Sequence, residues 1–310
     1  MFVIKRNLNI TTVIGVLSAC FVDFGYLIPI FGLLTATRTK FPLRVLCFVA
    51  IISVYFLTRL FFNISNFYFI IYFFLPIFYS LFLFQISGEL DNDKIVSFLF
   101  IIVVLDFLLF DAPELNDGRH TAFSHSSSIA SVLVACVFFG LRDAVRLSGH
   151  IQNFLAQIIL GSGSGIIASM IFYWKKTSAN FFLFSLGVLF LLFIDFDRLS
   201  LGYVIQVFEH KFDYAELAFS QTTSMDFIWG VNGGDVKGGD SAFTQFVVAN
   251  GIIGLFFFVW FFFIIISKKT LVVLAILFFS SFHYGVAFSP FGAFLIGYIG
   301  SRNWLSANDY

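Results

Sequence analysis

Charged residues are scarce in this chain of 310 residues: Asp, Glu, Lys and Arg make up 12% of it, whereas 59% is hydrophobic. A soluble globular domain carries about 25% charged residues. A chain of this size cannot hide so much apolar surface in one core, because folded domains leave a large share of their side-chain area exposed. The composition therefore excludes an ordinary soluble domain and predicts that the surplus apolar surface faces lipid.

An excess of either charge is also missing, because 18 basic residues balance 18 acidic ones. No basic stripe of the kind that binds nucleic acid is present, which excludes nucleic acid as a partner. The cysteines lack the CxxC spacing of a zinc or redox site and lie in apolar runs, where we expect them to be small packing residues; they are Cys20, Cys47 and Cys136. The five histidines form no ligand-like pair on one helical face. We therefore expect no metal and no cofactor.

What the chain has in abundance is long apolar runs. A membrane span needs about 20 apolar residues, and clear single spans are predicted at 43–61, 65–84, 94–111, 180–196 and 241–266. Three other stretches, 8–36, 127–174 and 270–300, are harder to divide. The first of them has no small-residue cleavage site, so we interpret it as a span rather than a removable signal.

The positive-inside rule, which counts Lys and Arg in short loops, divides these stretches. Placing Lys268 and Lys269 in the cytoplasm puts the loop 197–240 outside, and it makes 8–36, 147–174 and 270–300 hairpins that turn outside. The predicted fold is all-α, a single polytopic transmembrane bundle over 1–310 with about twelve crossings and both termini inside. All but five of the 18 basic residues then lie inside, the exceptions being Arg59, Arg119, Arg198, Lys211 and Lys237.

The outer loop 197–240 contains a helical pattern of its own. Its apolar residues recur at the 3.6-residue period of one helical face; the face consists of Val204, Val207, Phe208, Lys211, Phe212, Ala215 and Phe219. An amphipathic helix lying at the outer membrane interface fits this pattern. A packing helix that plugs the outer mouth of the bundle and a helix with a catalytic role are equally compatible with the pattern.

A short polar loop, Asn116–His125, is the first candidate site. Arg119 offers a planar fork of donors suited to phosphate oxygens, and His120 and His125 can supply or shuttle protons near neutral pH. The alternative is an interfacial Arg whose side chain reaches to the lipid headgroups.

Two glycine-dense segments are the next candidates. In the turn Gly161–Gly165, Gly163 and Ser164 would let a ligand approach the backbone, and nearby helix ends could offer N–H donors to an anion; close helix packing through small residues is the alternative. In the segment Trp229–Ser241, Asp235 and Asp240 could bind sugar hydroxyls, and Asp240 also stands where a helix N-cap is expected.

A last candidate is His283, within Phe282–Gly285. A polar residue inside a span usually marks a lined cavity, although an interfacial histidine is the alternative here.

In their order, these motifs resemble those of the bacterial O-antigen and capsule repeat-unit polymerases, the Wzy-type family, over residues of about 115–290. That family shows an outer-loop Arg, a glycine-rich turn between short helices, an Asp/Asn-Ser that opens a span with G-x-x-G, and a polar F-H-Y-like element. The matching segments are Arg119–His125, Leu160–Ile167, Gly239–Ser241 with Gly251–Gly254, and Phe282–Tyr284. Position 164 is Ser where the related ligases have Arg, which favours a polymerase over a ligase.

The resemblance implies glycosyl transfer at the outer face of the bacterial cytoplasmic membrane, between glycans linked to undecaprenyl pyrophosphate. Cations would stabilise the departing pyrophosphate, and Arg119 and Arg198, with Lys211 as a weaker candidate, are the groups able to do so. A base must remove the acceptor proton, for which the choices are His210, His125 or an outer Asp. A chain-length regulator and a flippase of the same pathway would be its protein partners.

Two other classes of protein compete with this interpretation. A transporter, such as a lipid-linked oligosaccharide flippase, usually shows internal repeats and charges near the membrane midplane; no repeat is visible, and the central acids are Asp23, Asp106 and Asp195. A membrane acyltransferase would need a His–Asp pair on a loop, and the sequence suggests no convincing pair.

Overall fold

The computed structural model of the chain is helical wherever it is described, and no strand occurs among the described residues. Those residues are 43–61, 75–77, 79, 92–111, 119–122, 124, 126–140, 147–174, 180–193, 201–231, 241–267, 270–281 and 285–307. The all-α prediction is therefore confirmed for this part of the chain. The predicted hairpin 8–36 lies outside the described residues, as does most of the span 65–84.

The helix bounds follow the apolar runs. The helices are α3 (Leu43–Phe61), α5 (Asn92–Leu109), α6 (Ser127–Gly140), α7 (Leu147–Leu160), α8 (Gly163–Trp174), α9 (Asn180–Phe193), α10 (Leu201–Ser220), α11 (Ser224–Trp229), α12 (Ala242–Ile265), α13 (Leu271–Ser281), the short 3₁₀ helix η4 (Val286–Phe288) and α14 (Pro290–Ala307). The stretch 127–174 divides into three helices and 270–300 divides between Ser281 and Pro290, as predicted. The turn between α7 and α8 is shorter than the predicted Gly161–Gly165, because α8 already begins at Gly163.

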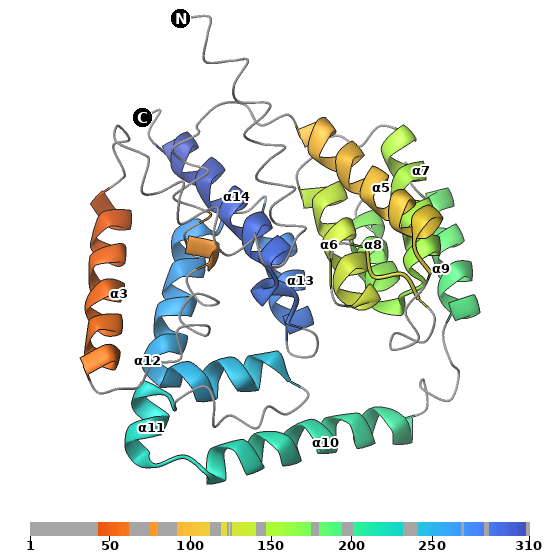
Figure 1. The fold of residues 1–310 in the computed structure, drawn as a ribbon. Helices are drawn as coiled ribbons and strands as arrows, with labels where there is room; N and C mark the ends of the chain where they lie inside the picture. Colours follow the sequence, from red (N-terminus) through yellow and green to blue (C-terminus); the bar gives the residue numbers. More distant parts are fainter. Residues whose placement is uncertain are drawn as a thin grey trace, which may run out of the picture.

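The helices form two groups with a third element across one end (Figure 1). In the first group α8 packs between α6 and α9, and α7 packs against α5 and α6. The second group contains α3, α12, α13 and α14, and it joins the first where α13 and α14 contact α6. The long helix α10 runs across the end of both groups and contacts α12.

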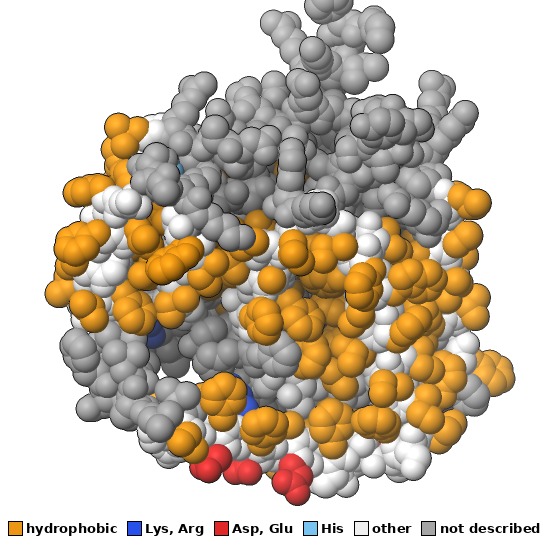
Figure 2. Space-filling view, turned by 180° about the vertical axis from the view of Figure 1, so that it is seen from behind, with side chains coloured by type: hydrophobic (Ala, Val, Ile, Leu, Met, Phe, Trp, Pro, Cys, Tyr) orange, Lys and Arg blue, Asp and Glu red, His pale blue; other side chains and the backbone are white. Residues whose placement is uncertain are grey.

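Large apolar side chains cover much of the outer surface of the described helices. Phe61, Trp174 and Phe263 are 83%, 80% and 71% exposed, and apolar atoms dominate the face drawn in Figure 2. Water would solvate such a surface poorly, because apolar area left in water costs free energy in proportion to its size.

One helix in the described part of the chain, α12, is long and apolar enough to cross a membrane, and the other apolar helical segments are 10–17 residues long. Yet α12 is not one straight rod. Its backbone leaves the helical region at Gly251, with φ 67° and ψ −177°, so a segment at 242–250 lies beneath the bundle and a segment at 251–265 rises through it (Figure 1). The predicted span 241–266 therefore coincides with this helix, and the break at Gly251 is a feature that the sequence analysis did not predict.

The start of α12 corrects the prediction made for Asp240. Ser241, and not Asp240, is its N-cap, because the Ser241 hydroxyl accepts a hydrogen bond from the backbone N–H of Thr244 at 3.3 Å. The sequence alone does not decide between Asp240 and Ser241, because the side chains of both residue types can accept a hydrogen bond from a free backbone N–H in the first turn of a helix.

Helix α10 confirms the helical pattern predicted within the outer loop. Val207, Lys211 and Ala215 lie half-buried on the side that faces the molecule, whereas Phe208 and Phe212 are 61% and 70% exposed. One edge of the predicted apolar face thus packs inward, and its other edge is uncovered in the described part of the chain. The acidic residues of α10 are exposed; they are Glu209, Asp213 and Glu216.

Candidate functional site

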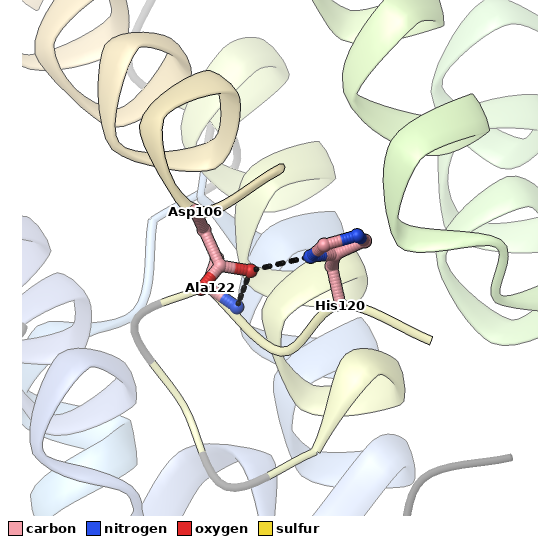
Figure 3. A network of polar contacts seen from close by, with 3 residues as sticks. All are labelled: Asp106, His120 and Ala122. Carbon is pink, nitrogen blue, oxygen red and sulfur yellow. Dashed lines mark hydrogen bonds and ion pairs between the residues drawn. The ribbon is translucent and has the colours of Figure 1, made fainter. Parts of the chain in front are cut away.

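The site begins with a carboxylate in the last turn of α5. Oδ2 of Asp106 lies 3.2 Å from Nδ1 of His120 and accepts a hydrogen bond from the backbone N–H of Ala122 at 3.1 Å (Figure 3). The Asp106 and His120 side chains are 19% and 13% exposed. The ring of Phe107 meets the ring of His120 edge-on, with 5.2 Å between the centroids. The imidazole is therefore held on two sides.

The carboxylate dictates which ring nitrogen of His120 carries the proton. An ionised carboxylate only accepts hydrogen bonds, so Nδ1 must donate, and in the neutral ring Nε2 then carries the lone pair. Nε2 lies on the side of the ring opposite Asp106 (Figure 3). A histidine oriented in this way can take a proton at Nε2 while the carboxylate stabilises the resulting imidazolium.

The loop that carries His120 is locally strained. Ala122 has φ 50°, in the left-handed region that costs a non-glycine residue roughly 1–2 kcal/mol. The hydrogen bond from its N–H to Asp106 holds it there. Backbone outliers of this kind persist where the surrounding structure fixes them, which is common at functional sites.

This pair corrects the sequence analysis, which found no convincing His–Asp pair and considered Asp106 only as a charge near the membrane midplane. Fourteen positions separate the two residues, so neither a motif nor a helical period joins them. The one available signal was that Asp106 is close to the end of its span and His120 follows in the next polar loop, so both belong to the same end of the bundle.

Hydroxyl groups cluster where α6 and α8 begin. The Ser162 hydroxyl donates to Ser128 Oγ at 3.1 Å, and Ser162 and Ser164 Oγ lie 2.9 Å apart. Ser162 is buried, while Ser164 and Gly163 are half-buried. The structure thus places Gly163 and Ser164 at the start of α8, beside the N-terminal turn of α6 to which the His120 loop leads.

The two glycines in the first turn of α8 have different roles. A Cβ added to Gly163 would meet only Phe190, at 3.5 Å, an ordinary contact. A Cβ added to Gly165 would collide with the side chains of Ser131 and Gln157. Close packing therefore explains Gly165, whereas it does not explain Gly163.

The remaining predicted cations and bases lie on two segments. Arg119 is half-buried next to His120, and Lys211 is half-buried on the inward side of α10. His210 is exposed and meets the ring of Tyr214 edge-on, with 4.6 Å between centroids. Lys or Arg side chains show as small patches on the face drawn in Figure 2, and acidic side chains gather at its lower edge.

Five predicted site residues lie outside the described residues: Arg198, His125, Asp235, Asp240 and His283. Among the side chains that the structure describes, no group of three or more His, Cys, Asp or Glu is arranged to hold a metal ion. Comparison with protein-family models, with curated proteins and with solved structures gave no match to the chain.

Proposed function

We propose that the chain is a multi-pass protein of the bacterial cytoplasmic membrane that polymerises oligosaccharide repeat units linked to undecaprenyl pyrophosphate, at the outer face. The observation that carries the proposal is the His120–Asp106 pair, beside Arg119 in one polar loop. Such a loop combines a base for a sugar hydroxyl with a cation for a departing phosphate, and glycosyl transfer from a lipid pyrophosphate needs both.

Membrane residence is supported by the surface and by the helix order. Large apolar side chains point outward on α3, α8, α9 and α12, and the described helices agree in order with the predicted spans and hairpins. The exposed apolar edge of α10, with acidic residues along its other side, suits a helix lying at the outer interface.

In the proposed reaction, Nε2 of His120 removes the proton from an acceptor sugar hydroxyl, and Asp106 stabilises the imidazolium that forms. The hydroxyl oxygen bonds to the anomeric carbon of the donor glycan while the bond from that carbon to the pyrophosphate breaks. Arg119 neutralises the charge that develops on the pyrophosphate, with Arg198 and Lys211 as further cations. The proton then leaves His120 to water.

This mechanism moves the base from His210 or His125 to His120. His210 is exposed and rests against Tyr214, whereas His120 is largely buried and has a carboxylate on Nδ1. A base fixed in one orientation loses less entropy when the reacting groups come together.

The proposal is tested by deleting the gene and restoring it on a plasmid. Deletion should leave carrier lipid or lipid A bearing a single repeat unit, and the polymer ladder should return with the wild-type gene and not with His120→Gln. An unchanged ladder in the deletion strain would refute a polymerase. Loss of even the single unit at the outer face would instead favour the flippase.

Topology is tested separately by labelling single cysteines in whole cells. Residue 163 and the loop 197–240 should react from outside, and residues 40, 144, 176 and 268 should not. Labelling of residue 144 from outside would contradict the hairpin of α7 and α8 and would place the His120 loop on the wrong side for this reaction.

The same pair supports a second candidate function, a membrane acyltransferase, because a His–Asp pair can also deprotonate a hydroxyl for acyl transfer. That enzyme would leave the ladder intact and remove ester-linked acyl groups from the polysaccharide. Mass analysis of the polymer from the deletion strain distinguishes the two candidates.

A further inference from the structure

Arg59 has no part in the function proposed above, although it is one of the five basic residues that the predicted topology leaves outside. It lies in the last turn of α3, and its side chain is 1% exposed. We propose that Arg59 is a structural cation attached to α3: it caps the C-terminal end of the segment 242–250 of α12 and so fixes the corner between α11 and α12.

The break at Gly251 creates the need for such a group. The last carbonyl groups of the segment 242–250 lose their partners in the following turn, and each must find another donor. The carbonyl of Val248 accepts from the N–H of Val231 at 3.0 Å. Nδ2 of Asn250 also donates to the Phe246 carbonyl, one turn back along the same segment, at 3.0 Å.

Two side chains of α3 satisfy the carbonyl groups of Ala249 and Asn250. Nη2 of Arg59 donates to the Ala249 carbonyl at 2.7 Å, and Nη1 donates to Oδ1 of Asn250 at 3.0 Å. The hydroxyl of Tyr55 donates to the Asn250 carbonyl. Tyr55 and Arg59 are one helical turn apart on the same face of α3, and the guanidinium carbon lies 5.8 Å from the centre of the Tyr55 ring.

A cation is favoured at this place by electrostatics as well as by hydrogen bonding. The C-terminal end of a helix carries a partial negative charge, and the effect is stronger where water is excluded. In membrane transporters, the ends of broken helices and their carbonyl oxygens bind alkali cations. Here the guanidinium occupies the equivalent position and remains attached to the chain.

This geometry removes Arg59 from the groups that could hold a phosphate. Nη1 and Nη2 already donate to oxygens of Asn250 and Ala249, and the side chain has almost no exposed surface. Nε has no hydrogen-bond partner among the described residues, but a side chain this deeply buried gives phosphate oxygens no access to it. Arg59 and Arg119 therefore have different roles, although the topology places both outside.

The corner that Arg59 fixes is built from close backbone contacts. Gly230, which ends α11, and Gly251 both have positive φ angles. A Cβ added to Gly230 would collide with backbone atoms of Ala249, and a Cβ added to Gly251 would collide with those of Ile228. Tyr55 also packs against Trp229, with 6.1 Å between the stacked rings. Loss of the guanidinium should loosen this corner and the adjoining helix α10.

Chemical rescue tests the inference without any assay of activity. Arg59→Ala leaves a space lined by the oxygens of Ala249 and Asn250, and the purified variant in detergent should unfold at a temperature lower by roughly 5 °C. Millimolar guanidinium should restore most of that loss, whereas equal concentrations of urea or sodium should not. Neither wild type nor Arg119→Ala should gain stability from guanidinium.

Two further variants keep the test decisive if Arg59→Ala does not fold. Arg59→Lys reaches one acceptor and not both, so its unfolding temperature should lie between those of Arg59→Ala and wild type. Asn250→Ala removes one of the two acceptors and should add little to the loss from Arg59→Lys when the two are combined. Additive losses, or the same guanidinium response in wild type and Arg59→Ala, would overturn the assignment. Because every readout is stability, failure of the proposed reaction would not affect it.

Discussion

Oδ2 of Asp106 lies 3.2 Å from Nδ1 of His120, and the same oxygen accepts a hydrogen bond from the backbone N–H of Ala122. One carboxylate therefore fixes both the imidazole ring and the loop that carries it. Asp106→Asn keeps the shape of the side chain and removes its charge, so the imidazolium loses its counter-ion. We expect the polymerisation rate in membrane vesicles to fall by about 10²–10⁴-fold. Asp111→Asn, an exposed acid beyond the end of α5, is the matched control and should have no effect. Equal rates for the two variants would remove Asp106 from the mechanism.

The two histidines make opposite predictions. His120→Gln should abolish most activity, because glutamine cannot take a proton, while His210→Gln should retain a full ladder, because His210 is exposed and rests against Tyr214. Polymer length on gels at matched expression measures both. If His210→Gln is the inactive variant, the base lies on α10 and the pair with Asp106 is structural.

The polymerisation rate should depend on the forked geometry of the Arg119 guanidinium more than on its charge. Arg119→Lys keeps the charge and loses bidentate binding, and removing such a contact from a developing anion costs roughly 3 kcal/mol, about a hundredfold in rate. A headgroup-anchoring Arg would accept Lys freely. Arg119→Lys and Arg119→Ala should therefore both shorten the polymer, with Lys211→Ala milder than either. A normal ladder from Arg119→Ala would establish anchoring as the role of this residue.

Gly251→Ala should destabilise the protein, because its positive φ alone costs roughly 1–2 kcal/mol for alanine and the new Cβ would collide with the Ile228 carbonyl. Gly187→Ala is the control within a helix, since no described atom lies within 4 Å of the added Cβ. Alanine there should stabilise α9 by about 0.5–1 kcal/mol. Thermal unfolding in detergent compares them, and equal shifts would contradict the break in α12.

The glycine turn between α7 and α8 offers a comparison of two neighbours. Gly165→Ala should lower stability, because its Cβ would collide with the side chains of Ser131 and Gln157. Gly163→Ala has room beside Phe190 and should leave stability unchanged. If the turn binds substrate, Gly163→Ala should nonetheless lower the rate at limiting substrate. A fully active Gly163→Ala would assign the whole turn to packing.

The sequence predicted most helices because apolar runs and turn residues are local signals. The division of 127–174 into α6, α7 and α8 followed from placing the Lys and Arg residues of the short loops on the cytoplasmic side. The helix α10 was indicated by the 3.6-residue period of its apolar side chains. Both depend on residues close together in the chain.

The parts that the sequence could not predict depend on contacts between distant segments. The run around Gly251 is apolar on both sides, and a single glycine is tolerated within many helices, so the break becomes evident only when Arg59 and Tyr55 of α3 are seen at the Ala249 and Asn250 carbonyls. The Asp106–His120 pair could not be predicted for the same reason, because its two residues belong to different segments. Among the residues at the candidate site, Arg119, Gly163 and Ser164 were predicted and Asp106 was not.

The short helices of the first group have a consequence for the lipid around them. Helices α6, α7 and α8 contain 14, 14 and 12 residues, and 14 residues of helix extend about 21 Å, whereas the hydrocarbon layer is about 30 Å thick. If they span as proposed, this hydrophobic mismatch would favour a thinner bilayer beside α7 and α8, which carry exposed apolar side chains. The outer leaflet would dip toward the loop of His120, and a polyprenyl-linked sugar could reach that loop sideways while its tail stays among the acyl chains.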